Sequence, residues 1–250
     1  MSLALEPFET GAPAAVRHFW ESRAIATSRQ QASGHADHGE RAGVTAGKNM
    51  DGFIDMFAAL ARANGMTHAQ VYTQRAAVTL PGYYRATKNW DLLMFNGRRL
   101  LAAIELKSQV GPSFGNNFNN RAEEAIGTAH DFWTAFREGA YGVDQPRPFV
   151  GWVMLVEDTW ASREPVQRVD APHFDVRPEF RGTSYLERYE ILCRRLMMEN
   201  LYTCAAVITS SRDAGADGGY SHVSQATSLR TFATTFASYA AAEATRPTEE

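Results

Sequence analysis

The sequence has few of the features that would export the protein, anchor it in a membrane or give it a soft-metal site. Only two of its 250 residues are cysteine, Cys193 and Cys204, and they lack the spacing of a metal-ligand pair. No run approaches the roughly 18 apolar residues that cross a bilayer. The N-terminus carries Glu6 and Glu9 and no basic stretch, unlike a signal peptide. We therefore expect a cytoplasmic protein, with no membrane partner, whose cysteines are reduced and buried.

Two signatures of nucleotide-dependent enzymes are also missing. The chain contains neither the GxGxxG pattern of dinucleotide-binding folds nor a P-loop. His35 and His38 have the spacing of metal ligands, but no partner His or Cys lies nearby in the sequence. These absences argue against a nicotinamide cofactor, ATP and zinc.

The charge is nearly balanced overall but uneven along the chain. A net charge of −3 argues against a protein that coats nucleic acid without specificity. Between Gly82 and Lys107, however, only two acids, Asp91 and Glu105, interrupt a basic segment. Such a segment suits a site that binds a polyanion through a metal ion, although a solvated hairpin would carry the same charges. The basic residues are Arg85, Lys88, Arg98, Arg99 and Lys107.

The spacing of apolar residues switches between the period of a helix and the continuous runs of buried strands. The helical spacing predicts helices at residues 13–29, 51–64, about 121–137, 184–199 and 226–243. The apolar runs predict strands at 149–156 and 205–208 and, around Asn96-Gly97, a β-hairpin of Trp90–Phe95 with Leu100–Glu105. Residues 111–120 and 211–224 have the composition of loops.

This order of elements predicts an α/β fold, in which a mixed β-sheet is flanked by helices on both faces. No composition shift marks a linker, so we expect a single domain over residues 1–250, with a frayed acidic tail at about 245–250.

The hairpin carries the residues that point to chemistry. Hydrolysis of a phosphodiester needs an activated water and neutralisation of the phosphate charge, and a magnesium ion held by Asp91 and Glu105 can supply both. Lys107, two positions after Glu105, lies on the same face of the strand and can orient or deprotonate the water or stabilise negative charge. The backbone carbonyl of Leu106 can be a further metal ligand. A solvent-exposed strand end is the structural alternative.

The turn decides whether Asp91 shares that face. A two-residue turn at Asn96-Gly97 would point Asp91 away from Glu105. A three-residue loop, Phe95–Gly97, with Gly97 in a left-handed bulge, restores the parity. Even then Glu105 would lie about 13 Å along the ladder from the partner of Asp91, so we expect a bend or bulge near Asp91.

Three stretches of the sequence resemble restriction endonucleases of the XhoI type, which belong to the PD-(D/E)XK nucleases. They are LPGYYRATKNWDLLMFNGRRLLAAIELKSQVGPSFGNNFNNRAEEAIGTAHD (80–131), GERAGVTAGKNMDGF (39–53) and SYLERYEILCRRL (184–196). Asp91, Glu105 and Lys107 match the catalytic core of that family. Trp90 replaces the proline of the nominal motif, a position that varies among these nucleases.

The resemblance implies a restriction-endonuclease-like fold and a type II enzyme that cuts both strands of double-stranded DNA at a short palindrome, CTCGAG, with Mg²⁺ and without ATP. A palindromic target implies a homodimer. A restriction enzyme also implies a cognate DNA methyltransferase that acts on the same site.

Nucleases of this fold often take a further acid from an N-terminal helix. Glu40 is the first candidate for this catalytic role. Asp51 is the second, and it also fits a purely structural N-cap of the helix at 51–64.

Side-chain amides and guanidinium groups are the expected readers of bases. The segment after the catalytic strand is rich in them, although helix capping and a polar turn would explain the same residues. Arg85 and Lys88 are better suited to phosphate contacts, and Gln109 to holding the attacking water or a phosphate. The candidate base readers are Asn116, Asn117, Asn119, Asn120 and Arg121.

Two other functions remain open on the sequence alone. A repair or recombination nuclease would use the same chemistry on DNA junctions or ends. A catalytically silent DNA-binding protein could keep the fold, although it would usually have lost an acid or the lysine.

Overall fold

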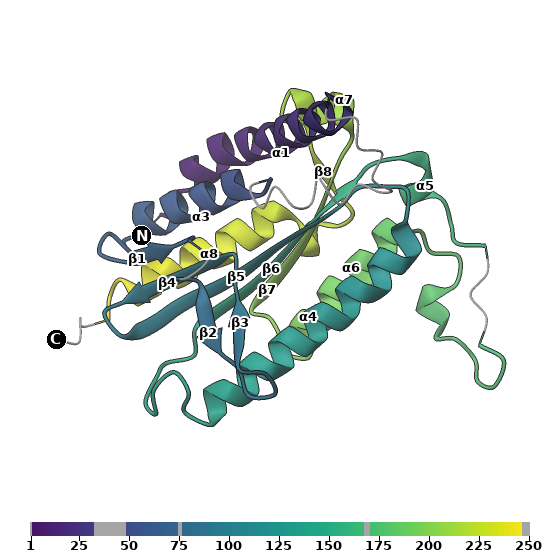
Figure 1. Cartoon of the computed structure of the whole chain (residues 1–250). Coiled ribbons are helices and arrows are strands. Elements are labelled where there is room, and N and C mark those ends of the chain that lie inside the picture. The colour runs from purple at the N-terminus through teal and green to yellow at the C-terminus, as the bar shows by residue number, and fades with distance from the viewer. Residues whose placement is uncertain (1, 33–48, 75–76, 168–170, 247–250) are drawn as a thin grey trace.

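The computed structural model describes residues 2–32, 49–74, 77–167 and 171–246. Its centre is a six-stranded sheet with the order β1-β4-β5-β6-β7-β8 (Figure 1). The central strands β5, β6 and β7 are parallel, and the outer strands pair antiparallel. The strands are β1 (Gln70–Tyr72), β4 (Leu92–Asn96), β5 (Arg99–Gln109), β6 (Phe149–Glu157), β7 (Cys204–Ser210) and β8 (Ser221–His222). A separate antiparallel ribbon joins β2 (Thr79–Pro81) and β3 (Thr87–Asn89).

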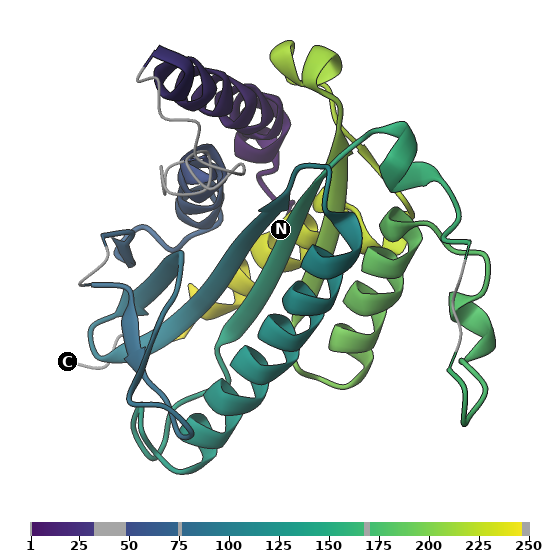
Figure 2. The same ribbon diagram turned by 45° about the vertical axis from the view of Figure 1, so that its right-hand side comes forward.

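Helices cover both faces of the sheet (Figure 2). One face packs against α1 (Glu6–Ala32), α3 (Asp51–Ala63) and α8 (Leu229–Glu243), and the other against α4 (Phe114–Arg137) and α6 (Tyr185–Met198). Shorter helices are α5 (Trp160–Arg163), α7 (Arg212–Ala216) and the 3-10 turns Pro178–Phe180 and Gln225–Thr227. This arrangement confirms the predicted α/β class with a mixed sheet between two helical layers. In the described part of the chain, no helix is both long and apolar enough to cross a membrane.

The two cores explain why the central strands are almost wholly apolar. Successive side chains of a strand point to opposite faces, so strands covered on both sides need apolar residues throughout. On β5, Ile104 and Leu106 enter the α1/α3/α8 core, whereas Ala103 enters the α4/α6 core. Glu105 and Lys107 share the parity of Ala103 and therefore face α4. Cys193 and Cys204 are buried free thiols, as predicted.

Most predicted elements are present, with shifted ends. The helix predicted at 13–29 extends over Glu6–Ala32, and the strands at 149–156 and 205–208 are β6 and β7. The loop predicted at 211–224 was wrong in part, because it contains α7 and β8. Three short strands, β1, β2 and β3, were not predicted.

The loop predicted at 111–120 was also wrong, because α4 begins at Phe114 and includes the asparagine-rich segment. Asn and Gly disfavour a helix interior, which is why the segment has the composition of a loop. Tertiary contacts override this preference. Phe114 is buried, and Phe118 packs edge-on against Tyr189 with ring centroids 5.0 Å apart. Further along α4, the apolar side chain of Ile126 is 48% exposed.

The hairpin turn differs in register from the prediction. Asn96 pairs with Arg99, so the turn is Gly97-Arg98, with Gly97 at φ +58°. The ladder then shifts, because Phe95 pairs with Leu100 and Met94 with Ala102, which leaves Leu101 as a bulge. Because of this bulge, Asp91 faces the same side of the sheet as Glu105, which we had expected from a three-residue loop.

Candidate active site

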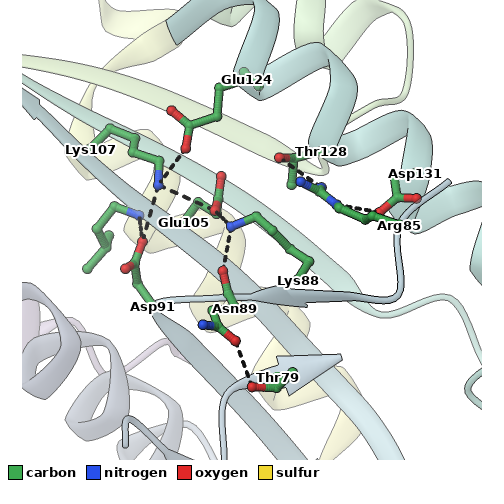
Figure 3. Close-up of polar contacts among 12 residues, drawn as sticks. Thr79, Arg85, Lys88, Asn89, Asp91, Glu105, Lys107, Glu124, Thr128 and Asp131 are labelled. Carbon is green, nitrogen blue, oxygen red and sulfur yellow. Dashed lines mark hydrogen bonds and ion pairs between the residues drawn. The ribbon is translucent and has the colours of Figure 1, made fainter. Parts of the chain in front are cut away.

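Asp91, Glu105 and Lys107 meet on the α4 face of the sheet (Figure 3). Because Leu92 pairs with Ile104, the next step of the ladder brings Asp91 beside Glu105, without the 13 Å offset that we expected. The Lys107 ammonium lies 3.4 Å from Glu105 Oε1 and 3.9 Å from Asp91 Oδ2. The structure thus brings the three residues together, and their catalytic roles stay a prediction.

Asp91 lies where β4 leaves the ladder. The chain bends there, as expected, and the Asp91 carboxylate accepts a 2.8 Å hydrogen bond from the Leu106 N–H. The backbone N–H of Trp90 instead donates to the Val78 carbonyl at 2.8 Å. In an extended strand the N–H and C=O of one residue point to the same side. The Leu106 carbonyl therefore points to the same edge of β5 as Asp91, and its role as a metal ligand stays a prediction.

Burial and charge act differently on the two carboxylates. Burial raises the pKa of Asp91, reinforced by the Glu105 charge and opposed by Lys107. The Glu105 side chain is fully buried. Its Oε1 accepts from Lys88 and Lys107, but its Oε2 is buried without a hydrogen-bond partner. Such an orphaned anionic oxygen is costly unless a cation binds it.

Lys88 lies inside this cluster. It comes from β3, and its ammonium pairs with Glu105 Oε1 and donates to the Asn89 carbonyl. Its side chain is only 15% exposed. Lys88 would therefore have to make its predicted phosphate contact with an ammonium that already shares the Glu105 carboxylate with Lys107.

Glu124, on α4, was missed by the sequence analysis. Its Oε1 lies 3.2 Å from the Lys107 ammonium, and its Oε2 lies 2.6 Å from Arg121 Nη1. Burial alone would lower the pKa of Lys107, but Glu105, Asp91 and Glu124 together raise it. The three carboxylates thus hold the pKa of Lys107 above its ordinary value, and its role in orienting or deprotonating a water or in stabilising negative charge stays a prediction. The spacing of Arg121 and Glu124 on a helix was a signal for their pairing, but nothing in the sequence indicated Lys107 as the third member.

The candidate base readers lie on the N-terminal turns of α4. Asn116, Asn119 and Asn120 are exposed, whereas Asn117 and Arg121 are half-buried. The helix holds these side chains on a regular scaffold that follows β5 after a short loop, and their contact with bases stays a prediction.

Gln109 has a structural environment. It is 4% exposed, and its amide nitrogen donates to the carbonyl of Phe114 at 3.1 Å and to that of Ser113 at 3.4 Å. Its oxygen accepts from the Tyr189 hydroxyl. Both ends of the amide therefore bond within the protein and hold the start of α4, and the predicted contact with the attacking water or a phosphate stays a prediction.

Arg85 also bonds within the protein. Its Nε donates to Asp131 Oδ2 at 2.8 Å, and Asp131 Oδ1 accepts from the N–H groups of Tyr83 and Tyr84 at 2.9 and 2.7 Å. Burial raises the pKa of Asp131, but these donors outweigh it and the pKa is lowered. Asp131 thus shapes the tip of the β2–β3 ribbon. The Arg85 side chain is still 41% exposed, so its phosphate contact stays a prediction.

Glu40 and Asp51 were the two candidates for an additional catalytic acid. Glu40 lies outside the described residues. Asp51 occupies the first turn of α3, with Met50 at the N-cap position, so the predicted N-cap role was wrong. Asp51 lines a groove between α1 and α3, which cover the sheet face opposite to Glu105 and Lys107.

Residues Gly111–Gly115 read GPSFG, which matches the G-x-S-x-G pattern of a serine-hydrolase nucleophile elbow. The geometry does not fit that chemistry. Ser113 has an ordinary φ of −84°, and no hydrogen bond joins its hydroxyl to a histidine of the described ranges. The match arises by chance in the segment that starts α4.

Comparison with known proteins identifies the lineage of this site. The family model of restriction endonuclease XhoI matches residues 29–222. The chain belongs to this family. The matched range of the XhoI family includes Asp91, Glu105, Lys107 and Glu124, together with the whole of α4.

Three relatives support the assignment to the XhoI family. The chain is 53% identical over 200 residues to the type II restriction enzyme XhoI of Xanthomonas vasicola, which covers 80% of this chain and 79% of the relative. It is 57% identical over 175 residues to the enzyme AbrI of Azospirillum brasilense, covering 70% and 77%. It is 48% identical over 196 residues to BstVI of Geobacillus stearothermophilus, covering 76% and 86%. No solved structure matches the chain.

Proposed function

We propose that this protein is a type II restriction endonuclease that cuts both strands of DNA by magnesium-dependent hydrolysis. The observation that carries the proposal is the convergence of Asp91, Glu105 and Lys107 on one face of the sheet in a chain of the XhoI family. The relatives are named type II restriction enzymes, and the chain spans more than three quarters of each.

The residues of the site fit a magnesium ion. Magnesium prefers oxygen ligands and is usually held by one or two carboxylates, with waters and phosphate oxygens completing the octahedron. Asp91 and Glu105 supply two carboxylates, and Leu106 a carbonyl directed to the same edge. The buried, unpartnered Oε2 of Glu105 is the oxygen that a cation would satisfy. Within the described ranges no three His, Cys, Asp or Glu side chains form a metal-binding group, so waters and phosphate oxygens would have to supply the remaining ligands.

When bound, the metal would activate a water and neutralise charge on the scissile phosphate. The remaining tasks belong to the lysines. The Lys107 amine lies within 3.9 Å of three carboxylates and, as an ammonium, can stabilise the negative charge that develops on the phosphate. Lys88 shares Glu105 Oε1 and can turn from it to a phosphate oxygen.

The target that we propose is CTCGAG, on the basis of the resemblance to XhoI. A palindrome read by identical subunits requires a homodimer in which each subunit cuts one strand. The proposal also requires a cognate methyltransferase that modifies the same site. Arg85, Arg121 and the exposed asparagines of α4 are the side chains that we expect to contact the DNA.

The test compares two unmethylated linear DNAs that differ only in a CTCGAG site or a scrambled version of it. Each is incubated with Mg²⁺, with and without a chelator, and with wild type, Glu105→Gln or Glu199→Gln. Glu199 is an exposed acid at the end of α6 and serves as a charge-matched control. Light scattering of the protein should give twice the mass of the chain.

Two discrete fragments from the CTCGAG substrate alone, lost with the chelator and in Glu105→Gln but not in Glu199→Gln, would support the proposal. Discrete cleavage at another sequence would change the target and keep the activity. Degradation from ends or at junctions would instead indicate a repair nuclease. DNA binding with no cleavage of any unmethylated substrate would indicate a silent binding protein.

A further inference from the structure

Among the described residues, Glu124 is the one carboxylate that contacts both a catalytic candidate and a candidate base reader. Each of its oxygens serves a different cation, with Lys107 at 3.2 Å from Oε1 and Arg121 at 2.6 Å from Oε2 (Figure 3 shows the Lys107 side). The Glu124 side chain is 35% exposed, so a change of solvent or partner at Arg121 can reach it. It lies between Lys107 on β5 and Arg121, which belongs to the turns of α4 that we expect to meet DNA.

On the catalytic side, Glu124 is the nearest of the three carboxylates around the Lys107 ammonium. Asp91 and Glu105 lie at 3.9 and 3.4 Å. These two are also the proposed metal ligands, so their charge is shared when a cation binds. Glu124 is then the carboxylate left to fix the position of Lys107, and it attaches that position to α4.

On the recognition side, Arg121 has N–H donors that its contact with Glu124 does not use. A guanidinium carries five N–H groups, and the contact with Glu124 runs through one nitrogen, Nη1. Arg121 follows Asn117 by one helical turn and sits beside the exposed Asn120, so its remaining donors lie next to the α4 surface that we expect DNA to meet. When a DNA acceptor draws Arg121 toward itself, it competes with Glu124 for the guanidinium, and Glu124 is left to bind Lys107 more strongly.

We propose that Glu124 is a positioning residue that couples contact of Arg121 with DNA to the placement of Lys107. Cleavage would then depend on the correct contact at Arg121 as well as on binding. This inference rests on the proposed nuclease function. An ion-pair network that only holds α4 against the sheet would show the same distances. Substitution of Glu124 would then lower stability, binding and cleavage together, and would not lower cleavage selectively.

The key variant is Glu124→Gln, which keeps the shape and removes the charge. The matched control is Glu123→Gln, the neighbouring exposed acid of the same helix. Three quantities are measured for each variant: the melting temperature, the affinity for the target DNA with Ca²⁺ in place of Mg²⁺, and the single-turnover cleavage rate at saturating DNA. The rate is measured on the target and on a site with one changed base pair.

We expect Glu124→Gln to lower the cleavage rate on the target by about 10- to 100-fold, as is typical when a group that orients a reactive side chain is lost. Binding should change by less than about threefold, because the DNA contact itself remains. The rate on the altered site should fall less, so that discrimination decreases. Arg121→Ala should also reduce discrimination, and the double variant should be no slower than Glu124→Gln alone, because both act through one link.

Three results would overturn the inference. One is a rate for Glu124→Gln within about twofold of that for Glu123→Gln. Another is a parallel loss of melting temperature, binding and rate, which would mean that Glu124 only stabilises the fold. The third is additive rate losses for Arg121→Ala and Glu124→Gln. Absence of cleavage by the wild type would overturn the proposed function, and this inference with it.

Discussion

The bond from Tyr189 to Gln109 offers a quantitative test of what Gln109 does. Tyr189 is fully buried, and its hydroxyl donates to the oxygen of Gln109, a residue that is 4% exposed. Tyr189→Phe removes the donor without opening a cavity. It leaves a buried amide oxygen unsatisfied, which costs about 1–3 kcal/mol. For a domain of this size, that corresponds to a fall in melting temperature of roughly 2–12 °C.

Tyr202→Phe provides the control at equal depth. Tyr202 is 1% exposed, and its hydroxyl donates to the Ala125 carbonyl at 3.1 Å. That carbonyl lies inside α4 and also accepts a helix bond, so its loss of one donor leaves it satisfied. We expect a cost of about 0.5–1 kcal/mol, clearly below that of Tyr189→Phe.

The assay is urea denaturation followed by circular dichroism, with a chelator present, for both variants and for Gln109→Leu. If Gln109 fixes the start of α4, Gln109→Leu and Tyr189→Phe should each lower stability, and their effects should not add. A cost below about 0.5 kcal/mol for Tyr189→Phe would refute the reasoning. Loss of cleavage by Gln109→Leu at unchanged stability would instead support the predicted contact of Gln109 with water or phosphate.

Three further predictions concern charge. Burial raises the pKa of Asp91, so its contribution to stability is present at low pH and is lost as the pH rises through that raised pKa. Asp91→Asn should therefore raise the melting temperature at pH 7 with a chelator present, while cleavage is lost. A lower melting temperature would contradict this. Asp131 behaves in the opposite way, because its donors Tyr84 and Arg85 outweigh burial and lower its pKa. Asp131→Asn should lower the free energy of unfolding by about 1–3 kcal/mol at neutral pH. In a denaturation series this difference from wild type should vanish as the pH falls through the Asp131 pKa, which lies below the ordinary range of aspartate. Added Mg²⁺ should raise the melting temperature of the wild type but not that of Glu105→Gln, and an equal rise in both would place the metal elsewhere.

The parts of the fold that could be predicted are those whose residues repeat one pattern. The stripe of α3, the capping box at Ser184 that starts α6 and the apolar run of β6 each indicate one structure locally. The parity of Glu105 and Lys107 also follows from strand geometry alone. These features need no information from distant residues.

What could not be predicted depends on contacts between distant segments. The bulge at Leu101 is set by how β5 fits between β4 and β6, and the hairpin sequence is equally consistent with another turn. The first turns of α4 form because Phe114 and Phe118 pack on α6, against the preference of their asparagines. Glu124 reaches Lys107 only after the chain has reversed direction, 17 residues later in the sequence.

One face of α4 is buried in the core and the other is exposed, so the two faces should tolerate substitution to different degrees. Ala125, Ala129 and Phe132 are committed to the core, whereas Asn116 and Asn120 face solvent and contribute little to stability. Substitutions on a surface helix face usually alter stability by less than about 0.5 kcal/mol. The outer face can therefore drift through many side chains while the scaffold and the carboxylates stay intact. If this face reads bases, as we propose, relatives of this chain could acquire new targets by substitutions along a single helix that leave stability nearly unchanged.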